Sequence, residues 1–119
     1  HTYRRQLRMI RLAQHLGVLL GVGTDAGAAG VQHGVGYMQE LQLYQEAGLA
    51  LEETLLAATR NSAQIMCMKD SLGIIAPGRP AYLLLIAGDI FANPGKQFDI
   101  KYLIRPQQEK IAEGSYQSA

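Results

Sequence analysis

The sequence predicts an α/β fold, and three observations indicate it. Apolar residues recur at helical spacing from Tyr3 to His15, and Gly17 follows as a helix-ending glycine would. The next segment, Val18 to Val22, is short and nearly all apolar, which is typical of a strand buried on both faces in a parallel sheet. A helix, a tight glycine and a buried strand together make half of a βα repeat.

Three further helices are expected in the first part of the chain. One runs from about Tyr37 to Ala47, a second begins near Leu51, and a third begins at Asn61 or Ser62, either of which can act as an N-cap. Ala50 occupies the N-cap position of the helix that begins near Leu51. Because alanine has no side-chain acceptor, this helix start is expected to be weakly capped.

The pattern changes near Asp70 from helices to short strands. Ser71 to Gly78 is expected to be a short strand that runs into a Pro-Gly turn. Further strands are expected at Ala81 to Ala87 and at Phe98 to Ile104. The polar tail from Pro106 to Ala119 is expected to fray.

Length and charge bound the class of protein. A chain of 119 residues fits one compact domain, and 48% hydrophobic residues can fill its core. The 11 basic and 10 acidic residues nearly cancel, which argues against a nucleic-acid partner held by charge. A local excess of arginine on the first helix is expected to be a solvated face, with an anion or partner patch as the alternative: Arg4, Arg5, Arg8 and Arg11.

Cysteine usage and apolar run length predict a cytoplasmic protein. Cys67 is the single cysteine, so it cannot form an internal disulfide, and its apolar neighbours predict a buried thiol in a reducing cytosol. The basic start of the sequence has no apolar core behind it, so no signal peptide is expected. The longest apolar run, Ala81 to Ala87, is too short to span a membrane, and no membrane partner is expected.

Asp25 is the first candidate for chemistry. It closes the apolar stretch that begins at Val18, and a glycine-rich loop extends to Gly36. Barrel enzymes place catalytic or metal-binding acids at the C-terminal ends of strands, where a carboxylate can ligate a divalent metal or accept a proton from a bound water. The same Thr-Asp-Ala-Gly sequence also fits an ordinary helix cap or Asx-turn, so the residues alone leave both interpretations open.

Few other residues suggest a site. His33 lies in the same glycine-rich loop and is a candidate for substrate contact, with an ordinary surface histidine as the alternative. A metal site needs three or four converging ligands, and the chain has no HxH, CxxC or HExxH motif and no phosphate loop. The helical glutamates are expected to lie on solvated faces: Glu40, Glu46, Glu52 and Glu53.

Taken together, the segments resemble the C-terminal part of the metal-dependent amidohydrolases, in the imidazolonepropionase and prolidase-like branch. The resemblance covers about residues 5 to 104 and depends on an ordered series of short matches rather than on one motif. The matching segments are Gly17-Val18, Gly23 to Gly27, Glu40-Leu41, Glu46 to Leu49, Glu53 to Leu56, Ala57 to Ala63 and Leu72 to Arg79.

The resemblance implies a particular fold. The family has a (β/α)8 barrel with a small β-sandwich, so the chain would be an α/β C-terminal fragment of the barrel plus part of the sandwich. Residues 1–69 would hold the last barrel strand, Val18 to Val22, with its flanking helices. Residues 70–105 would be the C-terminal share of the sandwich, and residues 106–119 a polar tail.

The resemblance also implies roles for two residues. Asp25 matches the last active-site residue of the family, which binds the metal and handles the proton of the attacking water. The loop from Gly27 to Gly36, with His33, would line the mouth of the substrate site. The implied cofactor is a divalent metal in the complete enzyme, and zinc is the first expectation. For the isolated chain, the alternative is that it binds no metal.

The chain also departs from the family pattern. The paired histidines of the first strand, the bridging group of the fourth strand and the histidines of strands five and six have no counterpart. Tyr82 stands where an aspartate usually follows the Pro-Gly turn, and Ala50 stands at a usual capping position. Because a barrel of this kind takes about 250 residues, this chain would supply only its last eighth.

Three hypotheses about function follow. The first is the C-terminal portion of an amidohydrolase that cleaves C–N bonds other than peptide bonds, in cyclic amides or acyl dipeptides, and that is inactive as this chain alone. Its partners would be the missing N-terminal barrel segment and a small amide substrate. The alternative is a stand-alone non-catalytic domain that self-associates through its exposed strand edge. A third hypothesis is one subunit of a split enzyme.

Overall fold

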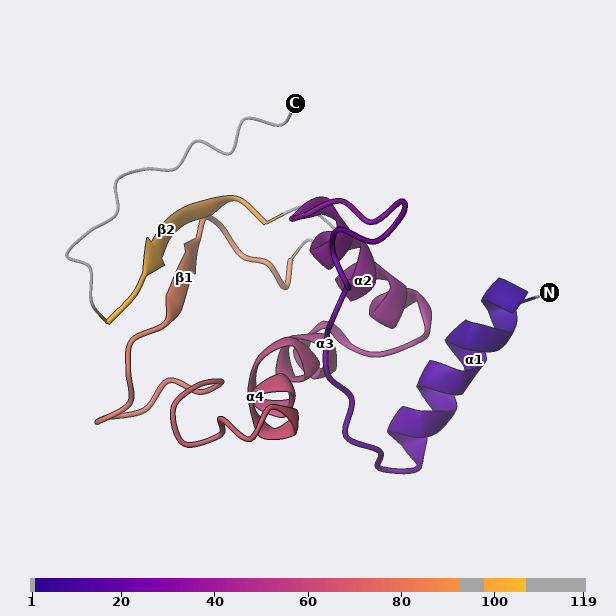
Figure 1. Ribbon diagram of the computed structural model, residues 1–119, viewed down its shortest axis with the longest axis horizontal. Helices are drawn as coiled ribbons and strands as arrows, with labels where there is room; N and C mark the ends of the chain where they lie inside the picture. Colours follow the sequence, from indigo (N-terminus) through magenta and orange to yellow (C-terminus); the bar gives the residue numbers. More distant parts are fainter. Residues whose placement is uncertain (1, 93–97, 107–119) are drawn as a thin grey trace. The chain divides into compact units, whose positions relative to one another are not determined.

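The computed structural model describes residues 2–92 and 98–106 of the chain (Figure 1). The chain divides into two units, His1–Ile74 and Ile75–Ala119. The organisation into residues 1–69, 70–105 and 106–119 stays a prediction. All of the predicted tail except Pro106 lies outside the described residues.

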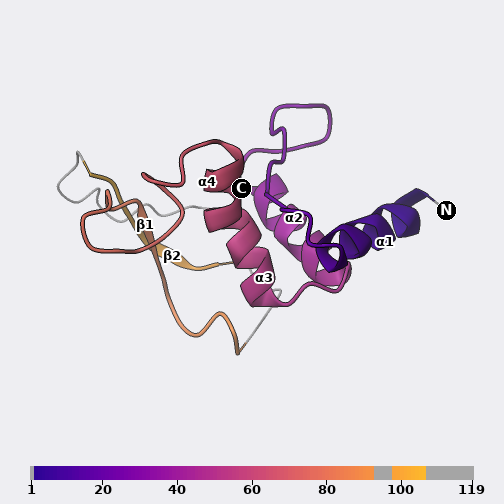
Figure 2. The same ribbon diagram turned by 90° about the horizontal axis from the view of Figure 1, so that it is seen from below.

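The first unit begins with two helices that confirm the predicted ones. Helix α1 spans Thr2–His15 and helix α2 spans Val35–Glu46, and α2 contacts both α1 and the helix that follows it (Figure 2). Gly17 ends α1 as predicted, since its φ is 74° and its N–H donates to the Gln14 carbonyl at 3.0 Å. The Val18 N–H donates to the Ala13 carbonyl at 2.9 Å, which completes the pattern of a left-handed helix end.

The next helices form one continuous rod rather than two separate helices. Helix α3 (Leu51–Leu56), a π-helical turn (Ala57–Asn61) and helix α4 (Ser62–Ile65) follow one another without a break (Figure 2). Helix α4 does begin at Ser62, but the predicted capping role of Asn61 or Ser62 is wrong. Both residues have helical dihedral angles, and the Ser62 hydroxyl donates to the Ala57 carbonyl at 2.8 Å instead of capping a new helix.

The core of the first unit is small. It lies in α2, in the continuous rod of residues 51–65 (called the long helix below) and in the connection between them. Its buried apolar residues are Leu41, Ala47, Leu49, Leu51, Ala57 and Ala63. Thr54 is fully buried among them, and its hydroxyl donates to the Ala50 carbonyl at 3.0 Å, so no hydroxyl is left without a partner in the core. The expected weak cap at Ala50 is confirmed, because the Ala50 side chain offers no acceptor to the N–H groups of this first turn.

The predicted buried strand at Val18 to Val22 is wrong for this chain. The segment belongs to no strand, and Val18 and Leu19 are 55% and 41% exposed. A strand needs a neighbour to bond its backbone, and the described residues of the first unit contain no sheet strand that supplies one. The apolar sequence is therefore present without the sheet that would bury it.

The second unit contains an antiparallel pair of strands. Strand β1 spans Leu83–Ile86 and strand β2 spans Ile100–Ile104, which confirms the strands predicted in these two regions within shorter bounds. Leu83 pairs with Ile104, and an irregularity between Leu85 and Ile86 shifts the register at the other end. A lone pair of strands is marginal in water, and these strands expose apolar residues along most of their length.

The expected strand from Ser71 into the Pro-Gly turn is only half correct. The turn is present, because the Arg79 N–H donates to the Ala76 carbonyl at 3.1 Å. Residues 71–74 form turns and bends rather than a strand. Gly73 has a φ of 90°, which is incompatible with an extended chain at that point.

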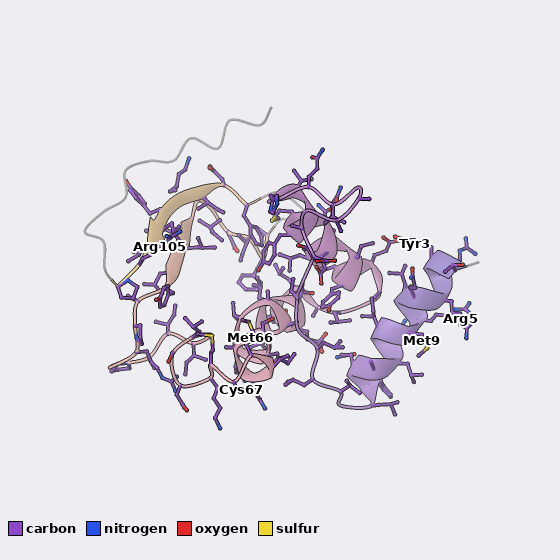
Figure 3. The ribbon with its side chains drawn as sticks, viewed as in Figure 1. Tyr3, Arg5, Met9, Met66, Cys67 and Arg105 are labelled. Carbon is purple, nitrogen blue, oxygen red and sulfur yellow. The ribbon has the colours of Figure 1, made fainter. Side chains whose placement is uncertain are left out.

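Cys67 is exposed, so the prediction of a buried thiol is also wrong. The helix ends at Ile65, and Cys67 takes a left-handed φ of 58° just beyond it, next to Met66 (Figure 3). The apolar neighbours therefore lie in a turn rather than on a buried helix face.

Within the described ranges, none of the helices combines the length and apolar composition needed to cross a bilayer.

Candidate functional site

Three side chains hold the backbone just ahead of Asp25. The Tyr44 hydroxyl donates to the Gly21 carbonyl at 2.5 Å, the Val22 N–H donates to the Ser62 hydroxyl at 3.0 Å, and the Gly23 N–H donates to a Glu40 carboxylate oxygen at 3.0 Å. Tyr44 and Glu40 come from α2, and Ser62 comes from α4. Three consecutive residues are therefore each bonded to a helix of the first unit.

Gly21 lies directly against the long helix. A Cβ placed at Gly21 would lie 2.7 Å from the Ile65 Cδ1 and 3.1 Å from the Ser62 Oγ. A side chain at position 21 would displace the tip of Ile65 and crowd the Ser62 hydroxyl, so glycine suits this close approach. The approach also brings the Val22 N–H within reach of the Ser62 hydroxyl, so steric fit and hydrogen bonding act at the same place.

The loop after Gly23 folds as two successive turns. The Ala28 N–H donates to the Asp25 carbonyl and the Val31 N–H donates to the Ala28 carbonyl, each at 3.0 Å. Asp25 has a φ of 50°, a left-handed conformation that aspartate tolerates better than most residues. The loop therefore places Asp25 at a turn immediately after the anchored segment.

The structure places both predicted site residues in this loop but does not join them. Asp25 is exposed, and its carboxylate makes no hydrogen bond or ion pair within residues 2–92 and 98–106. The imidazole of His33, also exposed, folds back so that its Nε2 is 3.6 Å from the position that a Cβ on Gly27 would take. His33 thus lies close to the turn that carries Asp25. The assigned roles of both residues stay predictions.

Glu40 is more than the solvated helix residue that the sequence predicts. Besides accepting the Gly23 N–H, it affects two tyrosines of α2. Burial raises the pKa of Tyr44 above its usual value of 10.0, and the negative charge of Glu40 raises it further. The pKa of Tyr37 is raised by the same two causes in the same order. Both phenols are therefore held neutral, which keeps Tyr44 a hydrogen-bond donor.

The described part of the chain does not by itself form a metal site. No three His, Cys, Asp or Glu side chains converge in it, and zinc requires three or four ligands. Asp25 is therefore a single donor among the described residues. A group held by Asp25 would need further ligands from outside the described residues.

Sequence reasoning did not identify Tyr44 or Ser62 as parts of this site. Tyr44 lies inside the helix expected from Tyr37 to Ala47, Ser62 is an expected cap, and neither is among the predicted site residues. Each contacts a backbone group 23 or 40 residues away in the chain, and no local pattern encodes such a pair. The glycines flanking Val22 are the one available signal, because paired glycines indicate close backbone approach.

An open groove lies elsewhere in the first unit, between α1 and α2. It has a volume of about 500 Å³, and it is lined by residues of α1 together with Leu43 of α2. Tyr3, Arg5 and Met9 of α1 border it (Figure 3). No residue of the Asp25 loop contributes to it, so the groove is not a substrate pocket around the candidate carboxylate.

Comparison with known proteins identifies the family. The model of the amidohydrolase family matches residues 2–114. Among solved structures, a Xaa-Pro dipeptidase with methionine bound in its active site is similar to this chain, with a TM-score of 0.73 and 28% sequence identity. The match covers 84% of this chain but 24% of the dipeptidase chain. A comparison with curated proteins gave no match. The chain belongs to the amidohydrolase family.

Proposed function

We propose that this chain is the C-terminal portion of a metal-dependent amidohydrolase barrel and acts in hydrolysis only when the remaining barrel is present. The observation that carries the proposal is Asp25: an exposed carboxylate without a partner among the described residues, at the end of an apolar segment whose backbone is anchored at three points. The length of the match supports it, since the chain spans 24% of the dipeptidase.

The exposed apolar surface of the first unit supports an incomplete barrel. Val18 and Leu19 expose apolar side chains beside a backbone that pairs with no strand in the described residues. Helix α1 has no buried residue, and its Met9 and Leu12 are 57% and 48% exposed. Leu16, directly after the helix, is 70% exposed. In the completed protein, Val18 to Val22 becomes the last barrel strand, and these apolar side chains pack on the added polypeptide.

In the completed site, Asp25 would serve as one ligand of a divalent metal and as a proton acceptor. A metal bound there would supply a nucleophilic hydroxide at neutral pH. The described residues supply one of the donors, so at least two further ligands are needed from outside them. The chain's own contribution is to hold the backbone ahead of Asp25 through the bonds to Gly21, Val22 and Gly23.

The substrate class proposed first is a small acyl dipeptide or, in departure from the expected restriction to bonds other than peptide bonds, a dipeptide; the cyclic amides come second. The structural neighbour is a Xaa-Pro dipeptidase, which supports the first choice. His33, close to Gly27 at the turn that carries Asp25, is the proposed substrate contact within this chain. A cytoplasmic location belongs to the same proposal.

The test begins with the coding sequence upstream of this chain. A reading frame that continues through an HxH motif is expected, and co-expression of both parts should yield a metal-loaded hydrolase. In that enzyme, Asp25→Asn should lower kcat by roughly 10²- to 10⁴-fold, the range of proton-transfer catalysis. Glu52→Gln, on the exposed face of α3, is the matched control and should leave kcat unchanged.

Two results would overturn this proposal. The first is stoichiometric zinc and hydrolysis by the purified chain alone, measured by mass spectrometry of bound metal and by a ninhydrin assay of released amino acids. The second is a purified chain that forms a stable metal-free oligomer by light scattering and gains no activity from any upstream segment. That second result would favour the stand-alone, self-associating domain.

A further inference from the structure

The π-helical turn and the candidate acid are connected through one hydroxyl. Ser62 donates its hydroxyl proton to the Ala57 carbonyl, five residues earlier, at 2.8 Å. The oxygen then presents its lone pairs to the Val22 N–H, which donates to it at 3.0 Å. Since a serine hydroxyl has a single proton, the bond to Ala57 orients Ser62 as an acceptor toward Val22.

The helix is widened where this contact is made. Residues Ala57–Asn61 form the π-helical turn, and Ser62 follows it directly. π-Helical turns are rare and are often found at functional sites. In an uninterrupted α-helix the Ala57 carbonyl would accept the N–H of residue 61, and a serine hydroxyl at 62 would reach the carbonyl four residues earlier, that of Ala58, rather than that of Ala57.

The anchored segment is separated from the candidate carboxylate by very little chain. Between Gly23, which bonds Glu40, and Asp25 there is only Thr24. Asp25 is held on its other side by the bond from the Ala28 N–H to its carbonyl. A displacement of Val22 is therefore transmitted to Asp25 through a short segment restrained at both ends.

We infer that Ser62 is a positioning residue for Asp25. Its hydroxyl, oriented by the Ala57 carbonyl at the π-helical turn, fixes the Val22 backbone and thereby the point from which the Asp25 carboxylate extends. Tyr44 and Glu40 hold the residues on either side of Val22, so loss of the Ser62 bond removes one of three anchors and loosens the segment while the helices stay packed. The catalytic part of this inference rests on the proposed role of Asp25.

The first arm of the test uses the full chain and needs no enzymatic activity. The variants are Ser62→Ala, which removes the hydroxyl, and Ser62→Thr, which retains it, with Ser71→Ala in an exposed turn as the control. Backbone ¹⁵N relaxation and amide exchange are measured. Ser62→Ala should lower the order parameters of residues 22–25 from about 0.85 toward 0.6 and speed Val22 exchange at least tenfold. Ser62→Thr and Ser71→Ala should match the parent.

The second arm uses the completed enzyme and separates positioning from mere stability. Ser62→Ala should lower kcat at least tenfold with KM changed less than about twofold, and Ser62→Thr should restore kcat. An unchanged kcat, or rigid residues 22–25 in Ser62→Ala, would overturn the inference. If the parent enzyme itself is inactive, the proposed function fails, while the relaxation arm still decides whether Ser62 holds the segment. If Ser62→Ala fails to fold, Tyr44→Phe replaces it, because it frees Gly21 by removing one hydroxyl.

Discussion

The carboxylate of Glu40 accepts the backbone N–H of Gly23 at 3.0 Å, from 17 residues farther along the chain. This bond ties α2 to the loop that carries Asp25. The same carboxylate raises the pKa of two tyrosines, so its charge is detectable independently of any catalytic assay. The surroundings of the candidate acid are therefore open to measurement in the isolated chain.

Replacing Glu40 by glutamine should lower the pKa of Tyr44 and Tyr37. The amide oxygen can still accept the Gly23 N–H, but the negative charge that opposes tyrosinate formation is lost. The measurement is an alkaline titration of the tyrosine ring resonances by NMR. Glu46→Gln is the matched control and should lower only the pKa of Tyr3, whose main cause of elevation is its hydrogen bond to Glu46. An unchanged Tyr44 in Glu40→Gln would contradict the arrangement.

The stability of the first unit should decline in alkali, partly through Tyr44. Burial first, and the charge of Glu40 second, raise its pKa above 10.0. Because the folded state holds this proton more tightly than the unfolded state, the contribution is complete below about pH 10 and is lost as the pH rises through the folded pKa. Urea unfolding at about pH 7 and about pH 11 measures it.

The variant that isolates this effect is Tyr44→Phe. It should cost about 1 kcal/mol near neutral pH, since the Gly21 carbonyl loses its donor. It should also lose less stability than the parent between the two pH values. Tyr82→Phe is the control, because Tyr82 is 56% exposed. An equal alkaline loss in Tyr44→Phe and the parent would argue against a raised pKa at this residue.

Gly73→Ala should be among the more damaging small substitutions. The residue has a φ of 90°, and a Cβ there would lie 2.8 Å from the Ala63 Cβ and 2.9 Å from the Arg60 Cα. Strain and overpacking together should cost roughly 2–5 kcal/mol of unfolding free energy. Gly17→Ala, with a φ of 74° but open space around it, should cost only about 1–2 kcal/mol. Equal costs for the two variants in urea unfolding would contradict the close approach.

Ala50→Ser should stabilise the first unit. Ala50 has the extended dihedral angles of an N-cap, and its N–H already donates to the Glu53 carboxylate at 2.8 Å. A serine hydroxyl would accept the Glu53 N–H and complete the reciprocal pair, for a gain of about 1 kcal/mol. The gain should appear as a higher thermal midpoint. Ala29→Ser, in the exposed loop, should show none.

Local sequence was enough to predict the elements that depend on local forces. The helix from Tyr3 to His15 and its end at Gly17 followed from apolar spacing and a glycine, and both are present as expected. The strands near Ala81 to Ala87 and Phe98 to Ile104 were also anticipated, because short apolar runs that follow turn residues favour extended chain. The family could likewise be recognised from short ordered matches.

Elements that depend on a distant partner were predicted wrongly or missed. Val18 to Val22 has the composition of a buried strand, but strand formation requires a neighbour that the described residues do not supply. Ser62 has the composition of a cap, but a hydroxyl can bond whichever group lies nearest, and here those groups belong to Ala57 and Val22. Asp25 was named from the sequence, whereas its anchoring through Glu40, Tyr44 and Ser62 was not.

The sequence by itself determined the family, the positions of the main helices and strands, and the candidate carboxylate at Asp25. Only the tertiary structure decided that Val18 to Val22 is unpaired, that residues 51–65 form one rod with a π-helical turn, and that three side chains hold the backbone ahead of Asp25. The reason is physical. Helix periodicity and turn preference act over a few residues, whereas strand pairing and side-chain anchoring depend on groups that only folding brings together.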